Sequence, residues 1–99
     1  MTGISFGEFY DSLYYGADID FCYKSLFYHI NAGYDKENKH NIIIYQYDRH
    51  PDYEPSYYNE IYSMSDVNAG ENLEKFLNLK LFNGKCIYEI CSDMEILYS

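Results

Sequence analysis

Two runs of alternating polar and apolar residues, 18–23 and 26–30, restrict the fold of this chain more than any other feature of its sequence. Such alternation predicts strands that bury one face and expose the other. A tight turn at Lys24–Ser25 would join the two strands into an antiparallel hairpin. In that register Asp20 lies directly opposite His29, and each strand contributes an apolar set to the core.

Two predicted helices begin with side-chain caps. Ser5 and Glu8 have the spacing of a capping box, in which each side chain accepts a hydrogen bond from the other residue's backbone N–H. This motif predicts a helix over residues 5–15. Asn68, with Glu71 three residues later, repeats the signal and predicts a second helix in the C-terminal third of the chain.

Two further strands are predicted between these helices. Residues 41–48 (NIIIYQYD) and 60–64 (EIYSM) have the composition of strands, and the chain beyond them is mainly helical in pattern. Residues 94–98 fit either the end of a helix or a last short strand. The order predicts one α+β domain over residues 1–99: an N-terminal helix, an antiparallel sheet of three to four strands, and C-terminal helices packed on one face.

These elements resemble a group of small acidic proteins. The capped aromatic helix, the DIDFCY hairpin strand, the acidic middle segment and the closing LFNGKCIYEI are similar to small proteins of low-GC Gram-positive bacteria and their phages. Some proteins of that kind inhibit host defence nucleases, anti-CRISPR proteins among them. The resemblance implies a phage or mobile-element setting and carries over no catalytic residue.

Acidic residues outnumber basic ones by sixteen to seven, which gives a net charge of −9 at neutral pH. Binding to a phosphate backbone depends on Lys and Arg, so direct contact with nucleic acid is disfavoured. A basic protein partner would be attracted and its association accelerated; solubility alone is the alternative reason for such charge. No apolar run spans a bilayer and the N-terminus lacks a signal-peptide pattern, so we expect a cytoplasmic protein with no membrane partner.

The segment DRHPDYEPSYYNEIY, residues 48–62, holds four tyrosines, four acids and both prolines of the chain. Exposed tyrosines offer large contact area with few torsions to freeze, and carboxylates pair with guanidinium groups. We therefore predict a partner-binding surface; the alternative is that this loop packs on its own sheet. The predicted binding residues are Asp18, Asp20, Asp48, Asp52, Tyr53, Glu54, Tyr57, Tyr58 and Glu60.

The predicted function is non-enzymatic. We expect an inhibitor that blocks a basic, nucleic-acid-binding surface of a host nuclease by local imitation of DNA. An immunity protein against a toxin nuclease would use the same physics and is the first alternative. The second is a small enzyme or redox protein using Cys22 and His29, which are diagonal neighbours in the hairpin, about 7–8 Å apart between backbones. The sequence leaves a homodimer open.

No cofactor or metal is expected. The chain has three cysteines, an odd number, and Cys86 and Cys91 lack the spacing of a zinc site, so these side chains are expected to act as small buried apolar groups. His40 and His50 fall in polar segments of the sequence, and solvated loop positions are expected for both.

Overall fold

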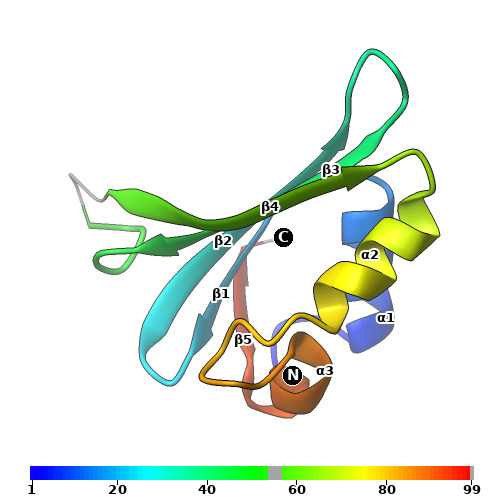
Figure 1. The fold of residues 1–99 in the computed structure, drawn as a ribbon. Coiled ribbons are helices and arrows are strands. Elements are labelled where there is room, and N and C mark those ends of the chain that lie inside the picture. The colour runs from blue at the N-terminus through cyan, green and yellow to red at the C-terminus, as the bar shows by residue number, and fades with distance from the viewer. Residues whose placement is uncertain (54–56, 99) are drawn as a thin grey trace.

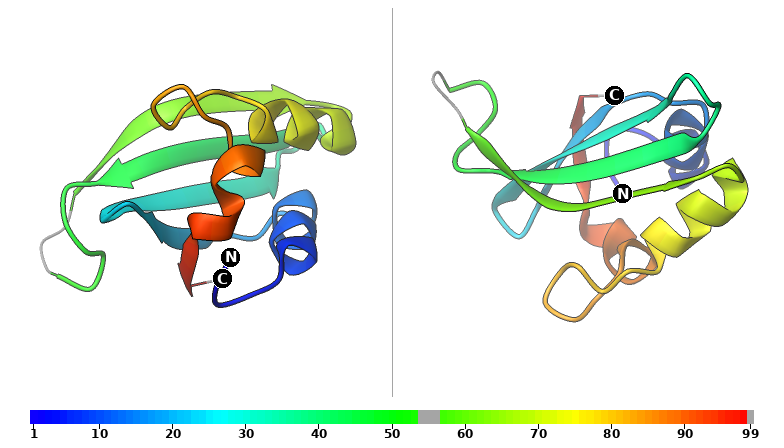
Figure 2. Two further views of the ribbon diagram at one scale, coloured as in Figure 1. Left: turned by 90° about the horizontal axis from the view of Figure 1, so that it is seen from below. Right: turned by 45° about the horizontal axis from the view of Figure 1, so that its top comes forward.

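The computed structural model describes residues 1–53 and 57–98. Within these residues, five strands form one antiparallel sheet in the order β4-β3-β2-β1-β5, and the helices lie on one of its faces (Figures 1 and 2). The predicted α+β class is confirmed. The elements are α1 (Phe6–Tyr14), β1 (Ile19–Tyr23), β2 (Leu26–Tyr34), β3 (His40–Tyr47), β4 (Tyr58–Asp66), α2 (Ala69–Leu77), α3 (Ile87–Ile90), a 3₁₀ turn (Cys91–Asp93) and β5 (Glu95–Tyr98).

Both predicted helix caps are present. The Ser5 hydroxyl accepts a hydrogen bond from the Glu8 backbone N–H (3.1 Å), and the Glu8 carboxylate accepts one from the Ser5 N–H (3.2 Å). The Asn68 side chain accepts from the Glu71 N–H (3.0 Å) at the start of α2. Each cap satisfies backbone donors that the first turn leaves free, which explains why the helices begin where the sequence predicts.

The predicted hairpin register between β1 and β2 is confirmed, with Phe21 opposite Tyr28 and Asp20 opposite His29. The turn residues Lys24 and Ser25 have φ values of 50° and 64°. Positive φ at both central residues is the geometry of the two-residue turns that match the twist of paired strands. The hairpin therefore forms although neither residue is the favoured Asn or Gly.

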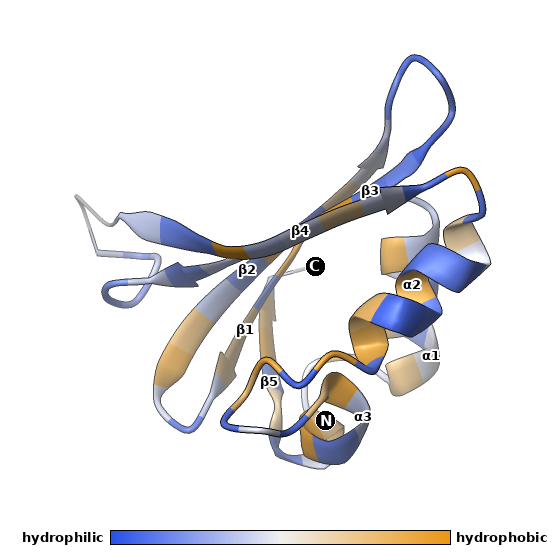
Figure 3. Ribbon diagram, viewed as in Figure 1, coloured by the Kyte–Doolittle hydropathy of each residue, from blue (hydrophilic) through white to orange (hydrophobic). Residues whose placement is uncertain are grey.

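The core lies between the helices and one face of the sheet. Buried strand residues on that face alternate with residues that point away. Apolar residues of the helices are also part of this core, and Figure 3 colours each residue by its hydropathy. The largest fully buried side chains are Phe9, Leu13, Ile19, Phe21, Ile30, Ile42, Ile44, Leu73, Phe76, Leu77, Ile87 and Ile90.

The C-terminal segment forms a strand. The helix α3 is one turn long, the 3₁₀ turn follows, and β5 pairs with the outer edge of β1. The N-terminus then joins β5: the Thr2 N–H donates to the Met94 carbonyl (3.0 Å), and the Ile96 N–H donates to the Thr2 carbonyl (2.9 Å). Of the two alternatives for residues 94–98, the last strand is the one that forms.

The prediction for His40 is wrong. This residue is fully buried at the start of β3, because it shares a strand face with Ile42 and Ile44. Its Nε2–H donates to the Leu13 carbonyl at the end of α1 (2.7 Å), and its Nδ1 accepts from the Asn72 amide (3.0 Å). The same amide donates to the His40 carbonyl (2.9 Å). This buried polar network fastens both long helices to the sheet.

The cysteines are free thiols. Cys86 is buried, as expected, whereas Cys22 and Cys91 are half-buried. None of the helices in the described ranges combines the length and apolar character needed to cross a membrane.

Candidate protein-binding face

The face of the sheet turned away from the helices carries a continuous set of side chains, none of which is buried. Strand alternation and register place these residues on it, because directly paired residues of antiparallel strands share a face. We call this surface the open face. It consists of Asp20, Cys22, Phe27, His29, Asn31, Asn41, Ile43, Tyr45, Tyr47, Tyr58, Glu60, Ser63, Ser65, Glu95 and Tyr98.

Apart from His29, the charged side chains of the open face are all carboxylates. All seven Lys and Arg residues of the chain are among the described residues, and none of them lies in one of the five strands found there. Asp20, Glu60 and Glu95 contribute carboxylates, and Asp18 stands directly before β1. Since the basic residues are confined to turns, loops and helices, the open face can attract cations without competition from its own strands.

A β-bulge in β4 decides which residues reach this face. Ile44 pairs with Tyr62, but the next residue of β3, Tyr45, pairs with Glu60, so Ile61 is an extra residue. Ile61 packs against the core. After the bulge, the odd-numbered residues Ser63 and Ser65 point to the open face. Before it, the even-numbered residues Tyr58 and Glu60 do, because the extra residue reverses the alternation.

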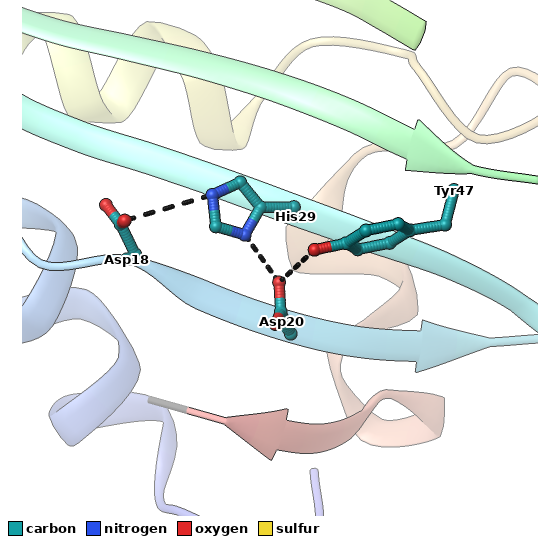
Figure 4. A network of polar contacts seen from close by, with 4 residues as sticks. All are labelled: Asp18, Asp20, His29 and Tyr47. Carbon is teal, nitrogen blue, oxygen red and sulfur yellow. Dashed lines mark hydrogen bonds and ion pairs between the residues drawn. The ribbon is translucent and has the colours of Figure 1, made fainter. Parts of the chain in front are cut away.

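Four polar side chains form a network near the middle of the face (Figure 4). The His29 Nδ1–H donates to Asp20 Oδ1 at 2.5 Å, and the other ring nitrogen lies 3.9 Å from Asp18 Oδ2. The Tyr47 hydroxyl donates to the same Asp20 oxygen at 3.3 Å. Both nitrogens of one imidazole thus face carboxylates.

This geometry favours the protonated imidazole. The hydrogen bond to Asp20 raises the pKa of His29 above its ordinary 6.5 and outweighs the lowering that partial burial causes. Partial burial, followed by the charge of Asp20, raises the pKa of Tyr47 to about 12, so its hydroxyl remains a donor.

Replacing Asp20 by asparagine is expected to lower the pKa of His29 toward 6.5, as followed by NMR titration of the ring protons. Because the folded-state pKa is raised, the pair stabilises the protein fully below about pH 6.5 and loses this contribution as the pH rises through the folded-state pKa. The Asp18→Asn variant is the control and should shift the pKa less, since Asp18 is 3.9 Å away. An unchanged pKa in the Asp20 variant would contradict this assignment.

Aromatic rings pack edge to face above this network. The rings of Tyr45 and Tyr58 have centroids 4.7 Å apart at 71°, and those of Tyr47 and Tyr58 lie 5.3 Å apart at 74°. His29 joins the group at 6.0 Å from Tyr58. Such pairs add stability beyond area burial. Tyr58 is still half exposed, so the cluster offers a ring that its neighbours already hold in position.

The loop after β3 folds back onto the open face. His50 packs its ring against Phe27 with centroids 4.9 Å apart. The Tyr98 hydroxyl of β5 donates to Asp52 Oδ1, and Tyr98 is also the strand partner of Asp20. Asp52 and Asp20 therefore belong to one surface, although they are far apart in the sequence.

The remaining predicted binding residues belong to the segment between β3 and β4. Asp48 accepts a hydrogen bond from the Tyr57 N–H (3.0 Å) and is 3.5 Å from Arg49, so it shapes the loop and is partly neutralised. Tyr53 and Tyr57 are both well exposed. The prediction for Glu54 lies outside the described residues.

The structure thus brings together Asp18, Asp20, Tyr58 and Glu60 on or beside the open face, with Asp52 joined through the loop. Sequence reasoning missed Tyr45 and Tyr47. The alternation of Ile42 and Ile44 with these rings was the available signal, since a strand that buries its isoleucines must expose the residues between them.

Cys22 and His29 are offset across the β1–β2 hairpin and are not direct strand partners. Cys22 has Phe27 as its direct cross-strand neighbour, and within residues 1–53 and 57–98 no hydrogen bond joins Cys22 to His29. The described part of the chain also holds no group of three or more His, Cys, Asp or Glu side chains arranged to bind a metal ion. Comparison with protein families, curated proteins and solved structures finds no match to this chain.

Proposed function

We propose that this chain is a non-enzymatic binding protein whose open face occupies a basic, nucleic-acid-binding surface of another protein. The observation that carries the proposal is a sheet face with carboxylates and partly exposed rings and with no Lys or Arg in its strands. A nuclease is the favoured class of partner, because its substrate groove supplies the basic surface that this face complements.

Carboxylates and aromatic rings on the open face would favour contact with arginine side chains of the partner. Arg side chains pair with carboxylates through two parallel hydrogen bonds and stack on aromatic rings. Glu60 and Tyr58 lie two residues apart on the open face and offer both kinds of contact. Preorganised rings reduce the entropy lost on binding, and the net charge of −9 accelerates encounter with a basic partner.

Imitation of DNA by this face is local. Asp18 and Asp20 are two residues apart, which along an extended chain separates their backbone positions by about 6.6 Å, whereas duplex DNA carries one charge per about 1.7 Å of axis. The face therefore matches a few phosphate sites of a groove, and Tyr58 would occupy a stacking site for a base. The setting that fits best is the bacterial cytoplasm, with a phage or mobile element as the source of an inhibitor directed against a defence nuclease.

The immobilised protein should capture a basic protein from a lysate of the host bacterium at low salt. Excess duplex DNA should release that protein, because both would compete for one surface. Retention should fall as the ionic strength rises, since exposed charges are screened beyond about 10 Å at 0.1 M salt. The nuclease activity of the released protein should be inhibited when the chain is added back.

Tyr58→Ser should weaken binding to this partner by about tenfold or more, because an interface aromatic anchor is worth upward of about 1.4 kcal/mol. Tyr15→Ser is the matched control, since Tyr15 is 76% exposed at the C-cap of α1, away from the open face. Calorimetry on the purified pair measures both affinities. Equal affinity for the two variants, or capture that DNA does not disturb, would refute the proposal.

A further inference from the structure

The open face has a shallow hollow next to the aromatic cluster. Its lining residues are Asn41, Ile43, Ser63, Met64 and Ser65. The hollow has a simple origin, because the strand partner of Asn41 on β2 is Gly33, and the two serines of β4 are small. Ile43 provides an apolar floor.

The polar groups of the hollow can accept hydrogen bonds from a ligand. One N–H of the Asn41 amide donates to the Lys39 carbonyl at 3.1 Å, and the Asn41 Oδ1 can accept a hydrogen bond from a ligand. The hydroxyls of Ser63 and Ser65 can accept as well as donate. These residues carry no positive charge, so an anionic occupant would gain no ion pair here.

The Glu60 carboxylate and the Tyr45 ring lie beside the hollow, at the next pair of residues along the same face. The pair Ile43–Ser63 crosses the hollow, and the next pair on the same face is Tyr45–Glu60. Alternate residues of a strand are about 6.6–6.8 Å apart. A long side chain that lies along the strands can therefore rest its stem on Ile43 while its head reaches Glu60 and the ring of Tyr45.

We propose that the hollow receives an arginine side chain of the basic partner. This inference deepens the proposed function and rests on it. The aliphatic stem would cover Ile43, the guanidinium would pair with Glu60, and its plane would lie against the ring of Tyr45. Arginine fits better than lysine because its planar fork can pair with a carboxylate and stack at the same time.

The direct test is an NMR titration of the whole protein with N-acetyl-arginine-N-methylamide. We expect backbone shifts centred on Ile43, Glu60, Ser63 and Ser65, with a Kd on the order of millimolar, as is usual for so small a ligand. The lysine analogue should bind several-fold more weakly, and the uncharged norleucine analogue should leave these resonances unchanged. Equal binding of norleucine, or shifts centred elsewhere on the protein, would overturn the proposal.

A second test alters the shape of the hollow and leaves its charge intact. Ser63→Leu fills the hollow at an exposed strand position and should weaken binding of both the arginine probe and the captured partner by about tenfold. Ser92→Leu is the matched control, at an exposed serine outside the open face. Unchanged affinity of the Ser63 variant for both would refute the arginine site.

The two proposals can fail separately. If Tyr58→Ser abolishes capture while arginine does not perturb the hollow, the partner uses the open face without this anchor, and only the arginine site is refuted. If arginine binds the hollow but no DNA-displaceable partner is captured, the identity proposed for the partner is refuted.

Discussion

Replacing Asn72 by alanine is expected to lower the free energy of unfolding by about 2–4 kcal/mol. The Asn72 amide is the donor to both His40 Nδ1 and the His40 carbonyl, and all of these groups are buried. Truncation leaves two acceptors without a donor and opens a small void between α2 and β3. Each unsatisfied buried group contributes about 1–3 kcal/mol, and the void adds to the loss.

Urea denaturation with a fluorescence or circular dichroism readout measures this change. The melting temperature should fall as well, by roughly 4–8 °C per kcal/mol for a domain of this size. Asn59→Ala, at an exposed position of β4, is the matched control and should stay within about 0.5 kcal/mol of the parent. A loss below about 1 kcal/mol for the Asn72 variant would mean that the network does not fasten the helices to the sheet.

Glu60→Arg is expected to weaken binding of the basic partner by about 100-fold. The substitution removes a carboxylate from the β4 side of the open face and places a like charge opposite the partner's basic groups. A juxtaposition of like charges at an interface disfavours binding by several kcal/mol, and about 2.7 kcal/mol corresponds to this factor. Because Glu60 is exposed, the stability of the protein should hardly change.

Glu37→Arg gives the matched control, with the same change in net charge at an exposed residue of the β2–β3 turn. It should alter only the long-range attraction, so its effect should be small and should vanish at high salt. The loss of affinity caused by Glu60→Arg should persist at high salt. If the two variants lose affinity equally, net charge alone governs the interaction and the open face has no special role.

Local patterns were sufficient to predict the starts of α1 and α2 and the β1–β2 hairpin. Caps at Ser5 and Asn68 and the alternation around Lys24–Ser25 act over a few residues, and the structure forms those elements with the expected register. His40 was mispredicted because its partners, Leu13 and Asn72, come from helices distant in sequence. The polar residues before it suggested a loop, although its two-residue spacing from Ile42 already pointed to the core face.

The candidate site was harder to predict from the sequence, because it depends on contacts between residues that are distant along the chain. The open face depends on the bulge at Ile61, which sets the side of the sheet on which Tyr58 and Glu60 emerge. Nothing in the local composition of β4 signals an extra residue, since a bulge is fixed by pairing with the neighbouring strand. The role of Asp48 in holding its loop likewise depends on a residue nine positions away, Tyr57.

The exposed edge of β4 affects how the protein behaves in solution. In the described part of the chain, nothing pairs with the far side of β4, and unprotected strand edges recruit further chains into aggregates. The bulge and the carboxylates of Glu60 and Asp66 oppose such recruitment. Acidification neutralises the carboxylates and leaves only the bulge, so samples are expected to stay dispersed near neutral pH and to precipitate by edge-to-edge growth in acid.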